Sequence, residues 1–143
     1  MSVPLRLHLV TLGVEDVERA ARFYEALGMQ RRVRGANGVA FFDAGGTVIS
    51  LYGQNDLAKD AGLSDRAAGS GSLTLAFNVE SESAVDEALD AAANAGGRIL
   101  KPGYRVSWGG YIGYFADPDD HVWEVAHNPQ FPFDERGQLV LPE

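Results

Sequence analysis

The chain has 143 residues, 45% of them hydrophobic and 22% charged, which is typical of one globular domain with its own core. Its formal net charge of −8 argues against nucleic acid as a partner, because nucleic-acid binding needs lysine and arginine to neutralise phosphates. With no long apolar run, no basic and apolar leader and no cysteine, we expect no membrane partner, no export and no disulfides, and therefore a cytoplasmic protein.

The first part of the chain predicts a strand, a helix and three more strands. Residues 5–14 alternate as a strand does. Asp16 is placed to cap a helix with one apolar stripe, and Gly28 is placed to end it. Glycine-rich turns then separate three expected strands near residues 30–34, 39–43 and 47–52.

A polar, small-residue stretch follows the fourth expected strand. It contains one short expected helix near residues 56–61 and ends in Gly69-Ser70-Gly71-Ser72. We interpret it as a connector rather than a lid. The predicted organisation is one domain with module one at 5–53, the connector at 54–71, module two at 72–127 and a tail at 128–143.

The second part repeats the order of the first. A strand is expected at 73–79, and Ser83 is placed to cap a helix, with Asp86 completing a capping box. A strand near 98–101 and a loop through Trp108 lead to a hairpin. Its strands are expected at 111–116 and 121–126, and the turn Asp117-Pro118-Asp119-Asp120 joins them.

These two parts form a faint internal repeat. Thr11-Leu12-Gly13-Val14 aligns with Ala76-Phe77-Asn78-Val79, and Val48-Ile49-Ser50-Leu51 aligns with Val122-Trp123-Glu124-Val125. The order of elements is the stronger signal. The repeat predicts two related halves.

Glu124 is the unusual side chain of the last hairpin. Period-two alternation puts it on one face with Val122 and Ala126, in otherwise apolar surroundings. Burying a carboxylate is costly unless it is paired. We therefore expect Glu124 to be satisfied by Ser50, Thr74 or water, to anchor a cationic or hydrogen-bonding group of a ligand, or to act as a general acid or base.

Two motifs carry a resemblance to a known family. WGGYIGYFADPDDHVWEVAHNP and LVTLGVEDVERAARFYEALG resemble the end and the start of the vicinal oxygen chelate superfamily, which includes glyoxalase I, extradiol dioxygenases and the bleomycin and fosfomycin resistance proteins. The resemblance implies an α+β fold in which two βαβββ modules form a curved mixed sheet around a cavity. It also implies pairing of modules across subunits, so we expect a homodimer, with the tail as either an intrachain arm or a dimer contact.

The family's metal enzymes draw four ligands from four equivalent strand positions. By the resemblance and the repeat, these positions are Leu9, Ser50, Thr74 and Glu124. Zinc, nickel and iron sites need nitrogen, sulfur or carboxylate donors, and only Glu124 supplies one. We therefore expect no metal and no other cofactor.

The predicted function is metal-independent binding of a small apolar or aromatic molecule in the cavity, with drug sequestration as one version. The expected ligand-binding residues are Leu9, Ser50, Tyr52, Thr74, Trp108, Tyr111 and Glu124. Tyr114 is a further aromatic residue expected near the cavity.

The alternative prediction is a lyase, isomerase or dioxygenase with a degenerate site. A metal-dependent form needs His8 or His127 to join Glu124, and a metal-free form uses Glu124 as the base. We expect His121 to be a surface residue of the turn. A third possibility is an accessory module with a vestigial cavity.

Overall fold

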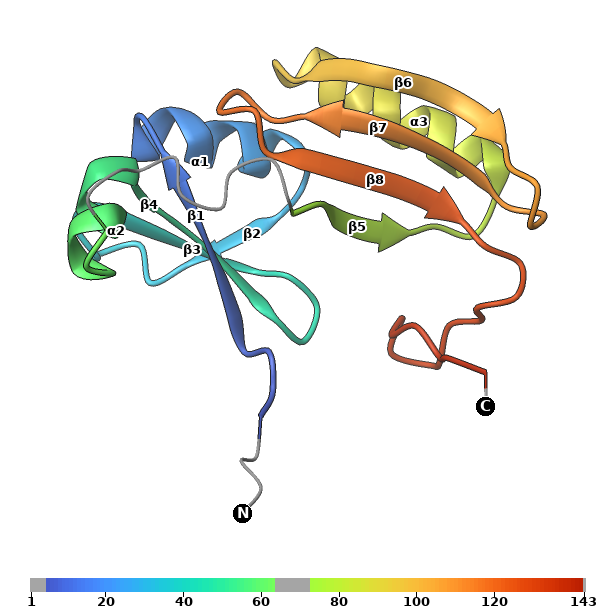
Figure 1. Cartoon of the computed structure of the whole chain (residues 1–143), viewed down its shortest axis with the longest axis horizontal. Helices are drawn as coiled ribbons and strands as arrows, with labels where there is room; N and C mark the ends of the chain where they lie inside the picture. The colour runs from blue at the N-terminus through green and yellow to red at the C-terminus, as the bar shows by residue number, and fades with distance from the viewer. Residues whose placement is uncertain (1–4, 64–72, 143) are drawn as a thin grey trace. The chain divides into compact units, whose positions relative to one another are not determined.

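A computed structural model describes residues 5–63 and 73–142. The chain divides into two compact units, Met1–Ala68 and Gly69–Glu143. Each unit holds one four-stranded sheet and one long helix (Figure 1). The α+β class and the two βαβββ halves expected from the sequence are confirmed.

The first unit contains a sheet of strand order β1-β4-β3-β2. Its elements are β1 (Leu9–Val14), α1 (Val17–Ala26), β2 (Gln30–Arg32), β3 (Val39–Asp43), β4 (Val48–Gly53) and α2 (Gln54–Asp60). Strands β1 and β4 run parallel, whereas β4, β3 and β2 are antiparallel neighbours. The expected cap is present, because the Asp16 carboxylate accepts a hydrogen bond from the Arg19 amide at 3.0 Å.

Helix α1 covers one face of this sheet. Leu12 and Val14 of β1 are buried on that face, as their alternation predicted. Tyr24 of α1 meets Phe42 of β3, with ring centroids 6.0 Å apart. The opposite face of the sheet carries Leu9 and Ser50.

The second unit contains a sheet of strand order β5-β8-β7-β6. Its elements are β5 (Leu75–Asn78), α3 (Glu82–Asn94), β6 (Arg98–Arg105), β7 (Tyr111–Ala116) and β8 (Val122–His127). Strand β5 is parallel to β8, and β8, β7 and β6 are antiparallel.

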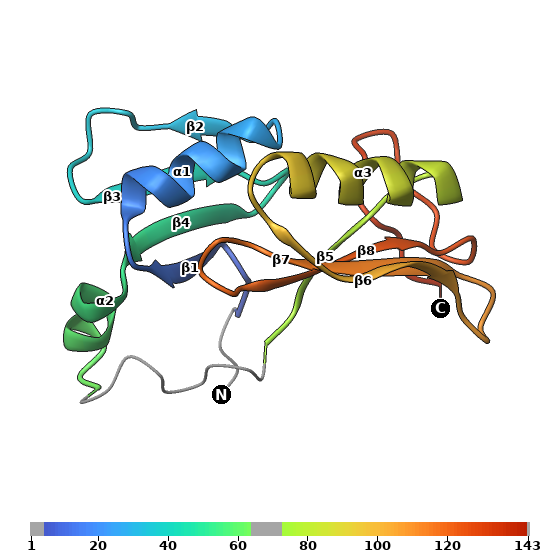
Figure 2. The same cartoon turned by 90° about the horizontal axis from the view of Figure 1, so that it is seen from above.

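Helix α3 lies along one face of the second sheet, as Figure 2 shows. On that face Trp123 stacks on Phe115 with centroids 6.3 Å apart and meets the edge of Phe77. Gly113 lets the helix approach closely, because a Cβ there would lie 2.5 Å from Leu89 Cδ1. The opposite face carries Glu124 and Tyr114.

The internal repeat is confirmed down to the strand register. Thr11 pairs with Ser50 in the first sheet, and Ala76 pairs with Glu124 in the second. These are the positions that the two sequence alignments equate. The halves therefore share topology, helix position and parallel pairing.

Some expected element boundaries were wrong. Strands β1 and β5 begin later than predicted. The pairing of β1 with β4 starts at Leu9 and Val48, and the pairing of β5 with β8 starts at Leu75 and Trp123. Strand β6 continues to Arg105 instead of ending near residue 101. Register shifts beside Pro102 let this edge strand accommodate the proline.

The predicted cap of the second helix was also wrong. Ser81, not Ser83, is the N-cap residue, and its hydroxyl accepts a hydrogen bond from the Ala84 amide at 3.0 Å. Ser83 instead lies in the first turn with its hydroxyl 3.1 Å from that of Ser81. A serine at either position fits the pattern, and the extended backbone of Ser81 decides between them.

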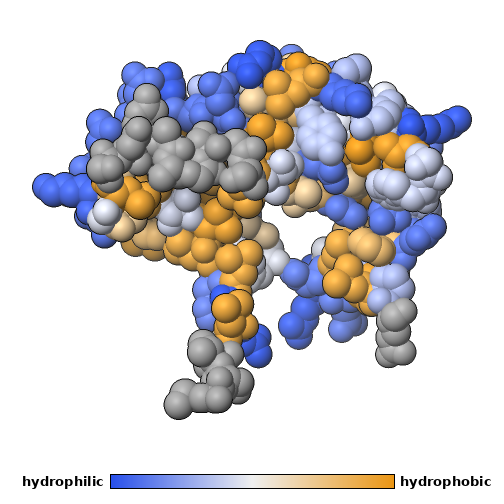
Figure 3. All heavy atoms as spheres, viewed as in Figure 1, coloured by the Kyte–Doolittle hydropathy of each residue, from blue (hydrophilic) through white to orange (hydrophobic). Residues whose placement is uncertain are grey.

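The tail folds back on itself in a short hairpin. Phe133 pairs with Leu139, and the Asp134 carboxylate accepts hydrogen bonds from the amides of Arg136 and Gln138. Apolar side chains remain exposed on the tail and on the segment before β1 (Figure 3). Within the described residues, no helix is long and apolar enough to cross a membrane.

Candidate functional site

Glu124 is paired with a tyrosine of the neighbouring strand. The Tyr114 hydroxyl donates a 2.6 Å hydrogen bond to Glu124 Oε2, and both side chains are half-buried. The two residues are direct partners in the β7–β8 register. This bond, followed by burial, raises the pKa of Tyr114 to about 12. Tyr114 therefore stays protonated and acts as a donor to the carboxylate across the neutral range.

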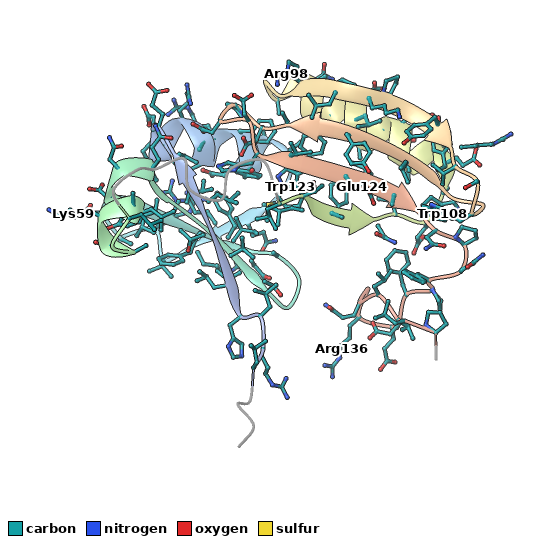
Figure 4. The ribbon with its side chains drawn as sticks, in the orientation of Figure 1. Lys59, Arg98, Trp108, Trp123, Glu124 and Arg136 are labelled. Atoms are coloured by element: carbon teal, nitrogen blue, oxygen red, sulfur yellow. The ribbon has the colours of Figure 1, made fainter. Side chains whose placement is uncertain are left out.

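This pair belongs to a row that crosses the whole second sheet. Lys101 of β6 is the partner of Tyr114, and Ala76 of β5 is the partner of Glu124. The Lys101 ammonium lies 4.1 Å from the centroid of the Tyr104 ring. A cation, aromatic rings, a carboxylate and a small residue thus follow one another on the face opposite α3. Glu124 is labelled on β8 in Figure 4.

The first sheet has an equivalent row without a carboxylate. It runs from Arg32 through Phe41 and Ser50 to Thr11. Ser50 is only 3% exposed, and its hydroxyl lies 2.6 Å from that of Thr11. One of these two hydroxyls therefore donates a hydrogen bond to the other.

Leu9 and Tyr52 lie on the same face of the first sheet as Ser50, as predicted, but they differ in their exposure and hydrogen bonding. Leu9 is 42% exposed at the start of β1. The Tyr52 hydroxyl donates to Asp60 of α2 at 3.0 Å, and this bond is the main reason why the pKa of Tyr52 is raised. Tyr52 of β4 is thus hydrogen-bonded to helix α2, which lies in the predicted connector.

Of the other predicted ligand-binding residues of the second unit, Tyr111 lies on the face away from Glu124. Tyr111 lies on the α3 face, where its hydroxyl donates to Asp86 at 2.9 Å and its pKa is raised by that bond. Trp108 is 45% exposed in the β6–β7 turn, with its ring over Gly110. Thr74 precedes β5 and is exposed, two residues before Ala76, the register partner of Glu124, so alternation puts it on the Glu124 face.

In the second unit, the register partners of Glu124 are Ala76 and Tyr114, not His121 or His127. His127 pairs with Tyr111, and its Nδ1 lies 3.1 Å from the Val79 carbonyl oxygen, which only accepts. His8 is exposed before β1, and His121 follows the aspartate turn. Asp120 adopts φ 69° in that turn, which aspartate tolerates as predicted.

Comparison with known proteins identifies the family. The model of the glyoxalase/bleomycin resistance protein/dioxygenase superfamily matches residues 6–125. The chain belongs to this superfamily. It is also 34% identical over 119 residues to the metallothiol transferase FosB of Shouchella clausii (strain KSM-K16), across 81% of this chain and 75% of the relative.

Solved structures of the superfamily agree with this assignment. A glyoxalase-related enzyme from Fulvimarina pelagi superimposes with a TM-score of 0.88 at 34% identity, covering 96% of this chain and 99% of that one. A lactoylglutathione lyase from Agrobacterium tumefaciens gives 0.69 at 21% identity, covering 92% and 100%, and this likeness concerns the fold alone.

The side chains at the four ligand positions of the superfamily do not fit a transition metal. Leu9 offers only hydrocarbon, and the Ser50 hydroxyl is bonded to Thr11. Thr74 offers a neutral hydroxyl, and Glu124 Oε2 accepts a hydrogen bond from the Tyr114 hydroxyl. Such a set lacks the nitrogen, sulfur or multiple carboxylate donors that these ions need.

The Tyr114–Glu124 hydrogen bond was not predicted from the sequence. Lys101 and Tyr104 were also not named as candidate site residues. The turn at residues 117–121 supplies a signal that was available in the sequence. Because Ala116 and Val122 flank it, counting back along both strands of a regular hairpin pairs Tyr114 with Glu124. Lys101 had no such signal, since the bulged β6–β7 register is irregular.

Proposed function

We propose that this member of the superfamily binds a small, largely apolar or aromatic molecule without a metal, on the face of the second sheet that carries Tyr114 and Glu124. The observation that carries the proposal is the 2.6 Å hydrogen bond between these residues at the position of a family metal ligand. A half-buried carboxylate with an aromatic donor suits orientation of a ligand polar group. Sequestration of a drug is one form of this function.

Binding of N-phenyl-1-naphthylamine, a neutral aromatic probe whose fluorescence rises in apolar surroundings, tests the proposal. We expect the same dissociation constant before and after dialysis against a chelator, and no stoichiometric transition metal in elemental analysis of the purified protein. Glu124→Gln should weaken binding, whereas Glu87→Gln, which neutralises an exposed carboxylate on α3, should not. Binding that disappears with the chelator and returns with a metal would contradict the proposal.

A metal-free enzyme is the second candidate. The name of the FosB relative supports catalysis, and the half-buried Glu124 carboxylate, oriented by Tyr114, supports the role of a general base toward a bound ligand. Thiol transfer and lactoylglutathione lyase assays in the presence of a chelator test it. Here Glu124→Gln should abolish turnover and leave binding largely intact, whereas a binding protein shows no turnover in either form.

We further propose that the chain forms a homodimer in the cytoplasm. The absence of cysteine is compatible with a reducing compartment, and the exposed apolar tail supports self-association.

A further inference from the structure

We propose that the Tyr114–Glu124 face of the second sheet selects an organic cation, namely an ammonium group attached to an apolar or aromatic body. Glu124 would oppose the charge, and the rings of Tyr104 and Tyr114 would lie beside it. This inference rests on the proposed binding function and names the class of its ligand.

The charge distribution of the chain favours a cation at this unit. Residues 5–63 contain seven Lys or Arg and seven Asp or Glu, so the described part of the first unit is neutral. Residues 73–142 contain four Lys or Arg and eleven Asp or Glu. The negative potential of the second unit attracts cations over a distance of about 10 Å at ordinary ionic strength.

The chemistry around Glu124 also favours a cation. Tyr114 donates to Oε2 and stays neutral, so it orients the carboxylate without cancelling its charge. Arg98 and Arg105 of the edge strand are engaged elsewhere, with Asp120 at 3.1 Å and Glu82 at 3.3 Å. A ligand cation would thus compete with Lys101, the cationic residue of the row, which lies two strands from Glu124.

Lys101 shows that this face accepts an ammonium group. Its Nζ lies over the Tyr104 ring, in the geometry of a cation–π contact, and its strand position is next to Tyr114. We infer that Lys101 is a tethered competitor for the place that the ligand cation would take. Removing its amine should therefore raise the affinity for a cation rather than lower it.

The experiment compares phenyltrimethylammonium with tert-butylbenzene, which has nearly the same shape and no charge. Dissociation constants are measured by amide chemical shifts of the full-length protein. We expect the wild type to bind the ammonium compound about tenfold or more tightly than the neutral one. Glu124→Gln should reduce this ratio to near one, and Glu87→Gln should preserve it.

Lys101→Met should strengthen binding of the ammonium compound by about two- to fivefold, the value of an exposed cation–π contact, and leave the neutral compound unchanged. Arg98→Met, which removes a cation at the start of the same strand (Figure 4), is the matched control and should change the affinity less. Circular dichroism verifies the fold of each variant.

The possible results distinguish cation selection from small-molecule binding in general. Equal binding of both compounds by the wild type overturns cation selection and leaves small-molecule binding in place. Binding of neither compound overturns both. Weaker ammonium binding by Lys101→Met overturns the role of Lys101 as a competitor, because it would make the lysine part of the binding surface.

Discussion

Tyr114 and Glu124 show how one hydrogen bond sets the properties of both partners. The Glu124 carboxylate accepts a 2.6 Å hydrogen bond from the Tyr114 hydroxyl, so loss of the phenol proton is disfavoured and the pKa of Tyr114 rises to about 12. In the unfolded chain a tyrosine ionises near pH 10. The contribution of this bond to stability is therefore intact below about pH 10 and is lost as the pH rises through about 12.

We predict that Glu124→Gln moves the titration of Tyr114 down toward the ordinary tyrosine value. The neutral amide removes the charged acceptor that holds the proton. NMR of ¹³C-labelled tyrosine follows the ring of Tyr114 separately from those of Tyr52 and Tyr111, whose pKa values are raised by other carboxylates. An unchanged titration would show that the Glu124 bond is not the cause.

Tyr111 and Tyr114 offer a matched pair of substitutions. Each hydroxyl donates to a carboxylate, but Tyr111 bonds Asp86 on the α3 face and Tyr114 bonds Glu124 on the other. Tyr114→Phe should lower the free energy of unfolding by up to about 1 kcal/mol, and Tyr111→Phe should lower it as well. Titration with N-phenyl-1-naphthylamine should distinguish them, because only Tyr114→Phe weakens binding. The reverse result would place the ligand on the α3 face.

The N-terminus of α3 is the element whose local chemistry is easiest to test. Ser81 satisfies the free Ala84 amide of the first turn, whereas the Ser83 hydroxyl meets only another hydroxyl. We predict that Ser81→Ala lowers the free energy of unfolding by about 1 kcal/mol and Ser83→Ala by less than about 0.5 kcal/mol. Urea denaturation of both variants provides the measurement, and a larger loss for Ser83→Ala would restore the original capping box.

At the scale of the whole molecule, the tail offers exposed apolar side chains to a partner. Its hairpin is held by its own hydrogen bonds, and Leu141 is 68% exposed. We predict a dimer of twice 15.4 kDa by light scattering. Leu141→Glu should shift it toward monomer, and Gln130→Glu, which adds the same charge at another exposed tail position, should not. A monomeric wild type, or a Leu141→Glu dimer of unchanged stability, would leave the tail as an intrachain arm.

The sequence alone determined the features that depend on residues close together in the chain. Alternation marked the buried face of β1, Asp16 marked the start of α1, and the aspartate turn marked the β7–β8 hairpin. The repeat then predicted two halves of equal topology. These signals are local because side-chain period, caps and turns act over a few residues.

Only the tertiary structure decided the contacts that β6 and α3 make with their neighbours. It placed Lys101 over Tyr104 and bonded the Tyr111 hydroxyl to Asp86 of α3, on the face away from Glu124. The bulges of β6 interrupt the simple period there, so counting residues does not locate Lys101. Contacts between strands depend on register, and register is set by the packing of the whole sheet rather than by the residues of one strand.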